Sequence, residues 1–161
     1  QGRTTPSSPL DIRYWSTTPY AWGDNSAVKY ALIPKSKHSS PPPAEMGDNY
    51  LGEAMQAHLS SHPASFDFCV QLRKGDMPIE NAGKAWSETE SPFVKVASLR
   101  FDKQQFAGVK EREDLAEVLS FSPGHALPED APLGGINRAR VAVYAALSKF
   151  RHTRDKRKNI A

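Results

Sequence analysis

Hydrophobic and polar side chains alternate in three short stretches of the chain, and this pattern predicts three β-strands. Residues 27–33 are rich in β-branched and aromatic side chains and lead into Pro34. Residues 66–72 place hydrophobic side chains at every second position, and residues 93–101 carry polar side chains on both faces. Because a period of two sorts side chains onto the two faces of a sheet, we expect a β-sheet whose last strand is partly exposed.

Three other stretches repeat hydrophobic residues at helical spacing, and they predict helices at 44–61, 111–119 and 132–154. The last helix is entered through the glycine pair 134–135 and ends in a cluster of cations. Between the first strand and the first helix, residues 36–43 consist mainly of Ser and Pro, which predicts an exposed linker.

The third helix carries the most suggestive pair of side chains, Arg140 and Tyr144. Residues four apart lie one turn apart on the same face of a helix, so the guanidinium can reach the phenol oxygen. A nearby positive charge favours the phenolate, and tyrosinate is one of the axial ligands that haem proteins use. The alternative is an ordinary amphipathic helix with Arg140 at its rim. Its buried face would consist of Ile136, Val143, Leu147 and Phe150.

Composition restricts the other function classes. The 161 residues, 39% of them hydrophobic, suffice for one domain, and no apolar run is long enough to span a bilayer. The chain has no phosphate-binding glycine loop, nucleophile elbow or HExxH zinc motif.

His58 and His62 have metal-ligand spacing without a third ligand, and His125 is a weak candidate for a general base. The single cysteine, Cys69, is expected to pack as a small apolar residue.

Three segments occur in an order that resembles the second half of the catalase family of haem proteins, most closely its smaller branch. The segments are FDFCVQLRKG, SPFVKVASLRFDKQQF and LAEVLSFSPGHALPEDAPLGGINRARVAVY. In that family two barrel strands precede an Asn/Gln-x-Phe segment, a Phe-x-Pro segment and a helix with Arg-x-x-x-Tyr. The corresponding residues here are 105–106, 121–123 and 140–144.

The resemblance implies an α+β fold in which antiparallel catalase-type β-barrel strands combine with helices. It also implies haem b as the cofactor, with Tyr144 on the C-terminal helix as the iron ligand. Arg140 would keep Tyr144 ionised, Arg151 would pair with a haem propionate, and Ile136 would line the haem face. The implied function is that of a haem-dependent oxidoreductase that uses hydrogen peroxide or an organic hydroperoxide.

By the same resemblance, residues 1–161 form the C-terminal part of a catalase-like haem domain that ends in a basic tail at 155–161. The family carries its distal histidine on the N-terminal half of the barrel, so this chain alone is expected to be inactive. We therefore expect a partner, either the missing N-terminal half or another copy of the chain, because unpaired strand edges favour pairing. The chain begins with Gln1 without a signal-peptide pattern, which suggests an excised piece and a cytoplasmic location.

Two hypotheses from other classes stay open. The chain could be a non-enzymatic haem-binding or interaction domain that keeps the catalase fold. Alternatively, with a net charge of +3 and a pI near 9.0, it could be a module that binds nucleic acid through residues 151–158. No platform of aromatic and basic side chains accompanies that tail, so nucleic acid is not the expected partner.

Overall fold

The computed structural model describes residues 5–43 and 45–158, and side chains up to residue 154. The described residues form two compact units. The first comprises residues 5–15, 30–70 and 94–109, and the second comprises residues 16–29, 71–93 and 110–158. The basic tail expected at 155–161 lies outside the described side chains.

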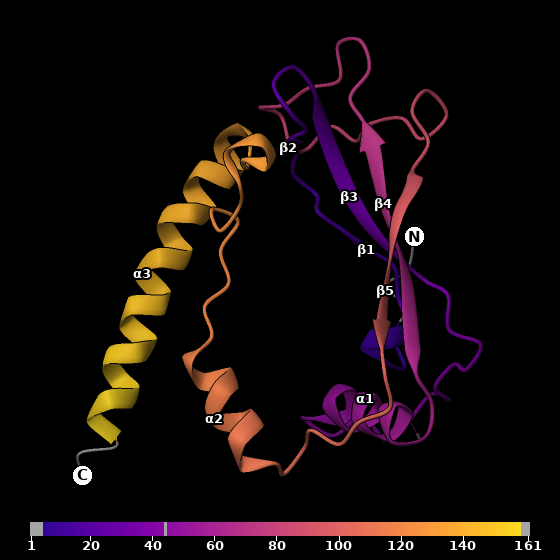
Figure 1. Cartoon of the computed structure of the whole chain (residues 1–161), viewed down its shortest axis with the longest axis vertical. Helices are drawn as coiled ribbons and strands as arrows, with labels where there is room; N and C mark the ends of the chain where they lie inside the picture. Colours follow the sequence, from indigo (N-terminus) through magenta and orange to yellow (C-terminus); the bar gives the residue numbers. More distant parts are fainter. Residues whose placement is uncertain (1–4, 44, 159–161) are drawn as a thin grey trace. The chain divides into compact units, whose positions relative to one another are not determined.

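Figure 1 shows the helices and strands of the chain. The strands are β1 (Tyr14–Trp15), β2 (Tyr20–Ala21), β3 (Ala27–Pro34), β4 (Ala64–Leu72) and β5 (Val94–Phe101). The helices are α1 (Tyr50–Ser61), α2 (Lys110–Val118) and α3 (Gly134–Lys158), with short 3-10 helices η1 (Pro9–Asp11) and η2 (Pro128–Asp130). All three strands and all three helices expected from the sequence are therefore present, with shifted ends.

The strands pair in the order β1-β3-β4-β5, and β2 pairs with β3 beyond the end of β1. β1 and β2 are antiparallel to β3, and β5 is antiparallel to β4. The expected antiparallel strands with an unpaired edge are present, and within the described residues the sheet is not a closed barrel, since β5 pairs with β4 alone. Closing a barrel that side chains can fill takes about eight strands, and the described chain supplies fewer.

Strand β5 is more exposed than its pattern predicted. Residues 94–100 are all exposed, including Val94, Val96 and Leu99 at 40–53%. A register shift at Cys69 skips Val96, so that Cys69 lies opposite Lys95. An apolar, unpaired edge of this kind is a template for pairing with a further strand.

The first unit packs around α1, which lies across the end of the sheet where β4 begins (Figure 1). Leu59 of α1, Leu10 of η1 and Phe66 of β4 form its buried core. Helix α1 begins at Tyr50, later than the predicted residue 44, which lies outside the described residues. The start is delayed because Gly47 accepts a backbone hydrogen bond from Tyr50 in a turn.

The second unit has its own core, in which Trp86 fastens the long loop between β4 and β5. Trp86 is buried against Ala27 and Met77, and its indole N–H donates to the Pro78 carbonyl at 2.9 Å. The Lys29 ammonium lies 5.0 Å from the centre of the Trp86 ring, and burial lowers the pKa of Lys29. Trp86 therefore anchors this loop against the start of β3.

Helices α2 and α3 both belong to the second unit and run side by side near the C-terminal part of α3 (Figure 1). The segment after α2 is joined to α3 through a hydrogen bond between Ser120 and Ser148, and through one from Arg151 to the Leu119 carbonyl. Among the described helices, none is both long enough and apolar enough to cross a membrane.

Candidate functional site

The start of α3 is fixed by the segment before it. Residues 131–133 pair with β2 and its neighbours, where the Ala21 N–H donates to the Ala131 carbonyl at 2.8 Å. Gly134 then turns the chain into the helix with a φ of +84°, a conformation that favours glycine. A Cβ atom at this position would lie 2.6 Å from the Ile79 carbonyl oxygen, so the close approach also requires glycine.

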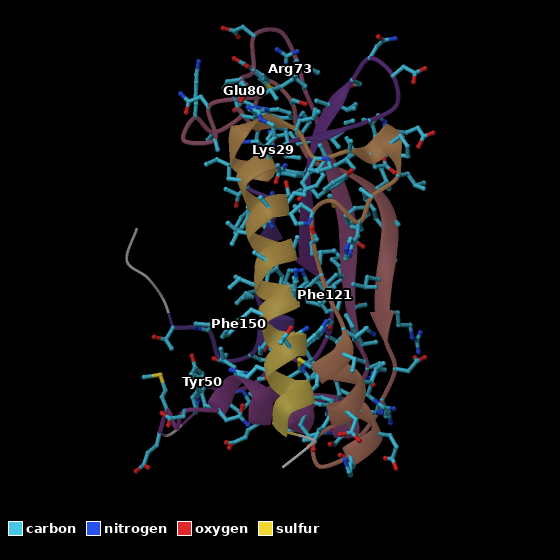
Figure 2. All side chains as sticks on the ribbon, turned by 90° about the vertical axis from the view of Figure 1, so that its left-hand side faces the viewer. Lys29, Tyr50, Arg73, Glu80, Phe121 and Phe150 are labelled. Carbon is cyan, nitrogen blue, oxygen red and sulfur yellow. The ribbon has the colours of Figure 1, made fainter. Side chains whose placement is uncertain are left out.

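A carboxylate from the second unit's long loop caps the first turn of α3. The Glu80 carboxylate accepts the Gly135 backbone N–H at 2.9 Å and binds the Arg138 guanidinium through two bonds of 3.0 and 3.1 Å. The Arg138 hydrogen bond and the Gly135 N–H lower the pKa of Glu80. Negative charge at a helix N-terminus is favourable, and Figure 2 shows Glu80 beside this end of α3.

Within the same first turn, Asn137 joins α3 to the segment before β2. Asn137 is fully buried, and its amide nitrogen donates to the Pro19 and Leu133 carbonyls at 2.9 and 3.0 Å. Its amide oxygen accepts hydrogen bonds from the Thr18 hydroxyl at 2.9 Å and from Arg140 at 3.1 Å. All four hydrogen-bonding positions of this amide are used, so it holds Arg140 in place.

Arg140 and Tyr144 come together as the sequence predicted. The guanidinium carbon of Arg140 lies 5.4 Å from the centre of the Tyr144 ring, within cation–π range. The pKa of Arg140 is raised, and its hydrogen bond to Tyr144 is the largest cause. Arg140 also donates to the Thr18 hydroxyl at 3.3 Å. The guanidinium is therefore held by buried polar groups on one side and faces the phenol on the other.

The face of α3 that carries these residues is open to solvent. With 3.6 residues per turn, Ile136, Arg140 and Arg151 fall within about 80° of Tyr144 on one side of the helix. Tyr144 is 39% exposed and Ile136 is 51% exposed. Further hydrophobic residues, 52–65% exposed, widen the face. They are Val143, Leu147 and Phe150.

This exposure contradicts the amphipathic alternative, in which the hydrophobic face of α3 would be buried. The periodicity was sufficient to show which residues share a face. Periodicity does not show which residues cover a helix face. Within the described residues, the hydrophobic face of α3 stays exposed to solvent.

Two hollows flank Tyr144 in the second unit. One, of about 410 Å³, lies between α3 and residues 120–125 and is lined in part by His125. The other, of about 310 Å³, lies between α3 and the end of α2 and is lined in part by Arg151. Figure 2 shows Phe121, which lines both hollows, beside the middle of α3. Tyr144 lines both hollows, so its side chain borders open space.

The sequence analysis missed the residues that fix this site from a distance. Thr18 and Glu80 lie 119 and 55 residues away from their contacts Asn137 and Gly135. A possible signal was Asn137 itself, a polar residue placed among the small residues of the first turn. His125 is one of the residues that line a hollow, and the other histidine candidates, His58 and His62, belong to the first unit.

Three solved structures that resemble this chain are catalases. A fungal catalase aligns with a TM-score of 0.68 and 17% identity over 91% of this chain and 32% of the catalase. Catalase A from Saccharomyces cerevisiae aligns with a TM-score of 0.66 and 15% identity, over 91% and 33% of the two chains. A bacterial catalase gives 0.65 and 16%, over 91% and 31%.

The chain has the fold of part of a catalase. It spans about a third of the length of these catalases. No protein-family model and no curated protein matches the sequence. At 15–17% identity, the likeness to catalases establishes the fold alone.

The side chains of α3 have the chemistry that binding a haem group requires. A phenol with a guanidinium beside it can supply an anionic ligand to iron, and the open hydrophobic face of α3 can cover an apolar ring system. No acidic residue occurs between Gly134 and Arg154, which suits a ligand that carries carboxylates. Within residues 5–43 and 45–154, no cluster of three or more His, Cys, Asp or Glu side chains could hold a metal ion by itself. A metal near α3 would therefore depend on Tyr144 and on the group that carries the metal.

Proposed function

We propose that this chain is the haem-binding part of a haem-dependent oxidoreductase that uses hydrogen peroxide or an organic hydroperoxide, as in the smaller catalase-like branch. The observation that carries the proposal is the Arg140 guanidinium against the exposed Tyr144 ring, on a helix whose hydrophobic face is open, in a catalase-like fold.

In this proposal Tyr144 is the iron ligand and Arg140 keeps its phenol ionised. Arg140 can do so because Asn137 and Thr18 hold the guanidinium on its other side. Arg151 would exchange its hydrogen bond to the Leu119 carbonyl for one to a haem propionate. Ile136 would contact the ring of the haem. The bound haem itself would supply the iron centre at which peroxide reacts.

The test is a titration of the purified chain with ferric haem, followed by absorption spectroscopy. The expected wild-type spectrum has the Soret and charge-transfer bands of a ferric tyrosinate complex. Tyr144→Phe should lose the charge-transfer band, because it removes only the phenol oxygen. Tyr50→Phe is the matched control, since Tyr50 begins α1 in the first unit.

The outcomes of this titration distinguish an error in the ligand assignment from an error in the proposed function. A tyrosinate spectrum that persists in Tyr144→Phe would exclude this residue as the ligand. If the wild-type chain takes up no haem, the titration is repeated with the upstream half of a catalase-like protein added. Failure in both titrations would contradict the proposed function.

The proposal includes a protein partner that completes the barrel, either an N-terminal catalase-like half or a second copy of the chain. Its support is the exposed edge of β5 and the coverage of only about a third of the catalases. Replacing Val96 with Lys should weaken the association in sedimentation velocity, because a charge on an open strand edge disfavours pairing. Thr89→Lys adds the same charge outside the strand and should leave association unchanged.

A non-enzymatic haem-binding domain of the same fold is the second candidate. One observation favours it: the chain contains the candidate iron ligand Tyr144 but spans only about a third of the length of a catalase. Haem uptake without peroxide turnover, even with the completing half present, would support this second candidate over the first.

A further inference from the structure

Outside the α3 site, three histidines of the first unit meet at the end of α1. The rings of His38 and His62 are stacked, with centres 4.1 Å apart and planes inclined by 3°. His58 stands edge-on to His38, with its ring centre 4.6 Å away. His58 and His62 are 6.3 Å apart. His38 belongs to the segment between β3 and α1, so the contact joins that segment to the helix.

His58 is the buried member of the group. The residue is 2% exposed, and within the described residues neither ring nitrogen has a hydrogen-bond partner. Burial lowers the pKa of His58, while the nearby Pro63 carbonyl acts in the opposite direction. A buried imidazole without partners is stable only as the neutral form, because a charge there would be desolvated.

The segment that carries His38 is held on both sides of it. The Lys35 N–H donates to the Ser65 carbonyl at 2.9 Å, and the Ser40 N–H donates to the Asp11 carboxylate at 2.7 Å. Residues 36–43 contain neither helix nor strand, and the Ser36 hydroxyl also accepts the Ser65 N–H at 2.9 Å. These bonds and the stacked rings attach the segment. Loss of the ring contacts would leave the segment attached mainly at its ends.

We propose that His38, His58 and His62 form an acid-sensitive clasp, which holds residues 36–43 against the end of α1 when the rings are neutral and releases them when the rings are protonated. Like charges 4.1–6.3 Å apart repel one another. Histidine is the side chain whose ordinary titration range lies near neutral pH.

The surrounding charges do not cancel this repulsion. The charged groups that act on His58 are Asp11 of η1, His38 and His62. Asp11 supplies one negative charge against three imidazolium charges and also accepts the Ser40 N–H. A metal ion is not the favoured occupant, because the described residues include no group of three such side chains arranged to hold one.

The direction of the pH effect follows from the state of His58. A histidine whose pKa is lowered by folding binds its proton more readily in the open state, so closure is favoured above its ordinary value of 6.5. The clasp should loosen as the pH falls from about 6.5 toward the lowered value.

The test is amide hydrogen exchange, resolved by NMR at about pH 7.5 and about pH 5.5 and divided by the intrinsic rate at each pH. The Ser40 amide should lose protection by about ten-fold or more at the lower pH, while the Phe66 amide in β4 keeps its protection. Equal Ser40 protection at both pH values would overturn the proposal. So would parallel loss at Phe66, which would indicate global unfolding.

Variants of the histidines test whether their rings cause the loss of Ser40 protection at the lower pH. The double variant His38→Gln/His62→Gln should change Ser40 protection by less than about two-fold between the two pH values. His125→Gln, in the second unit, is the matched control and should respond like the wild type. If the double variant does not fold, His62→Gln alone is used, because His62 is exposed. An unchanged acid response in that variant would overturn the clasp.

Discussion

The Arg140 guanidinium carbon lies 5.4 Å from the centre of the Tyr144 ring, one helical turn away on α3. The same guanidinium is bound by Asn137 and Thr18, which are buried. An arginine with buried partners cannot swing freely into solvent, so its charge stays beside the phenol. This arrangement links the packing of α3 to the chemistry proposed for Tyr144.

The first prediction concerns the charge of Arg140. Arg140→Gln should raise the pH at which the tyrosinate charge-transfer band of the haem complex disappears, because the phenolate loses its neighbouring cation. A shift of about one pH unit corresponds to about 1.4 kcal/mol of lost stabilisation. The measurement is a spectroscopic pH titration of the haem-loaded chain.

Arg138→Gln is the control for Arg140→Gln, because Arg138 lies on the same helix but binds Glu80 at the surface. The control should titrate like the wild type. An identical titration of Arg140→Gln and wild type would show that Arg140 does not act on the ligand.

The second prediction concerns Asn137. Asn137→Ala should lower the free energy of unfolding by about 2–3 kcal/mol, because it leaves buried groups such as the Pro19 carbonyl without a partner. Urea unfolding monitored by circular dichroism measures this change. Asn25→Ala, in an exposed turn, should change the unfolding free energy by less than about 0.5 kcal/mol. Equal effects of the two substitutions would contradict the role given to Asn137.

The third prediction concerns the turn into α3. Gly134→Ala should destabilise the chain by about 2 kcal/mol or more, because alanine is strained at a φ of +84° and its Cβ would meet the Ile79 carbonyl. The neighbouring substitution Gly135→Ala meets only contacts of 3.4 Å and should change stability by less than about 1 kcal/mol. Thermal unfolding of both variants compares them. A tolerated Gly134→Ala would mean that the turn is not fixed as described.

The sequence predicted those parts of the site that lie within one helix. Arg140 and Tyr144 are four residues apart, so helical geometry alone brings them together. The contacts of Thr18 and Glu80 could not be predicted in this way, because they join segments more than fifty residues apart. Residue spacing does not encode such contacts; they arise when β2 pairs with the segment that leads into α3.

The long strands of the fold could also be predicted from the sequence, whereas the shortest strands could not. The periodicity of β3, β4 and β5 identified each strand, since each has eight or nine residues. Strands β1 and β2 have two residues each, too few to show a period. Residues 69–71 of β4 are all buried, which departs from the alternation expected for a half-buried strand. Gln71 can be buried because its amide nitrogen donates hydrogen bonds to the Trp86 and Ser91 carbonyls.

The last prediction concerns the acid response of the α3 cap. The pKa of Glu80 is lowered from its ordinary 4.5 by Arg138 and by the Gly135 N–H, so ionised Glu80 stabilises the fold above about pH 4.5. This contribution is lost as the pH falls through the lowered value. Glu80→Gln should therefore be less stable than the wild type at about pH 6, and the difference should shrink toward about pH 3.

Urea unfolding at both pH values measures the stability difference. Glu45→Gln removes an exposed carboxylate from the first unit, and should show no such pH-dependent difference. A stability gap between Glu80→Gln and wild type that stays constant from about pH 6 to about pH 3 would contradict the cap. It would mean that the Glu80 side chain acts through its shape and its neutral hydrogen bonds, and that its charge at the start of α3 contributes nothing measurable.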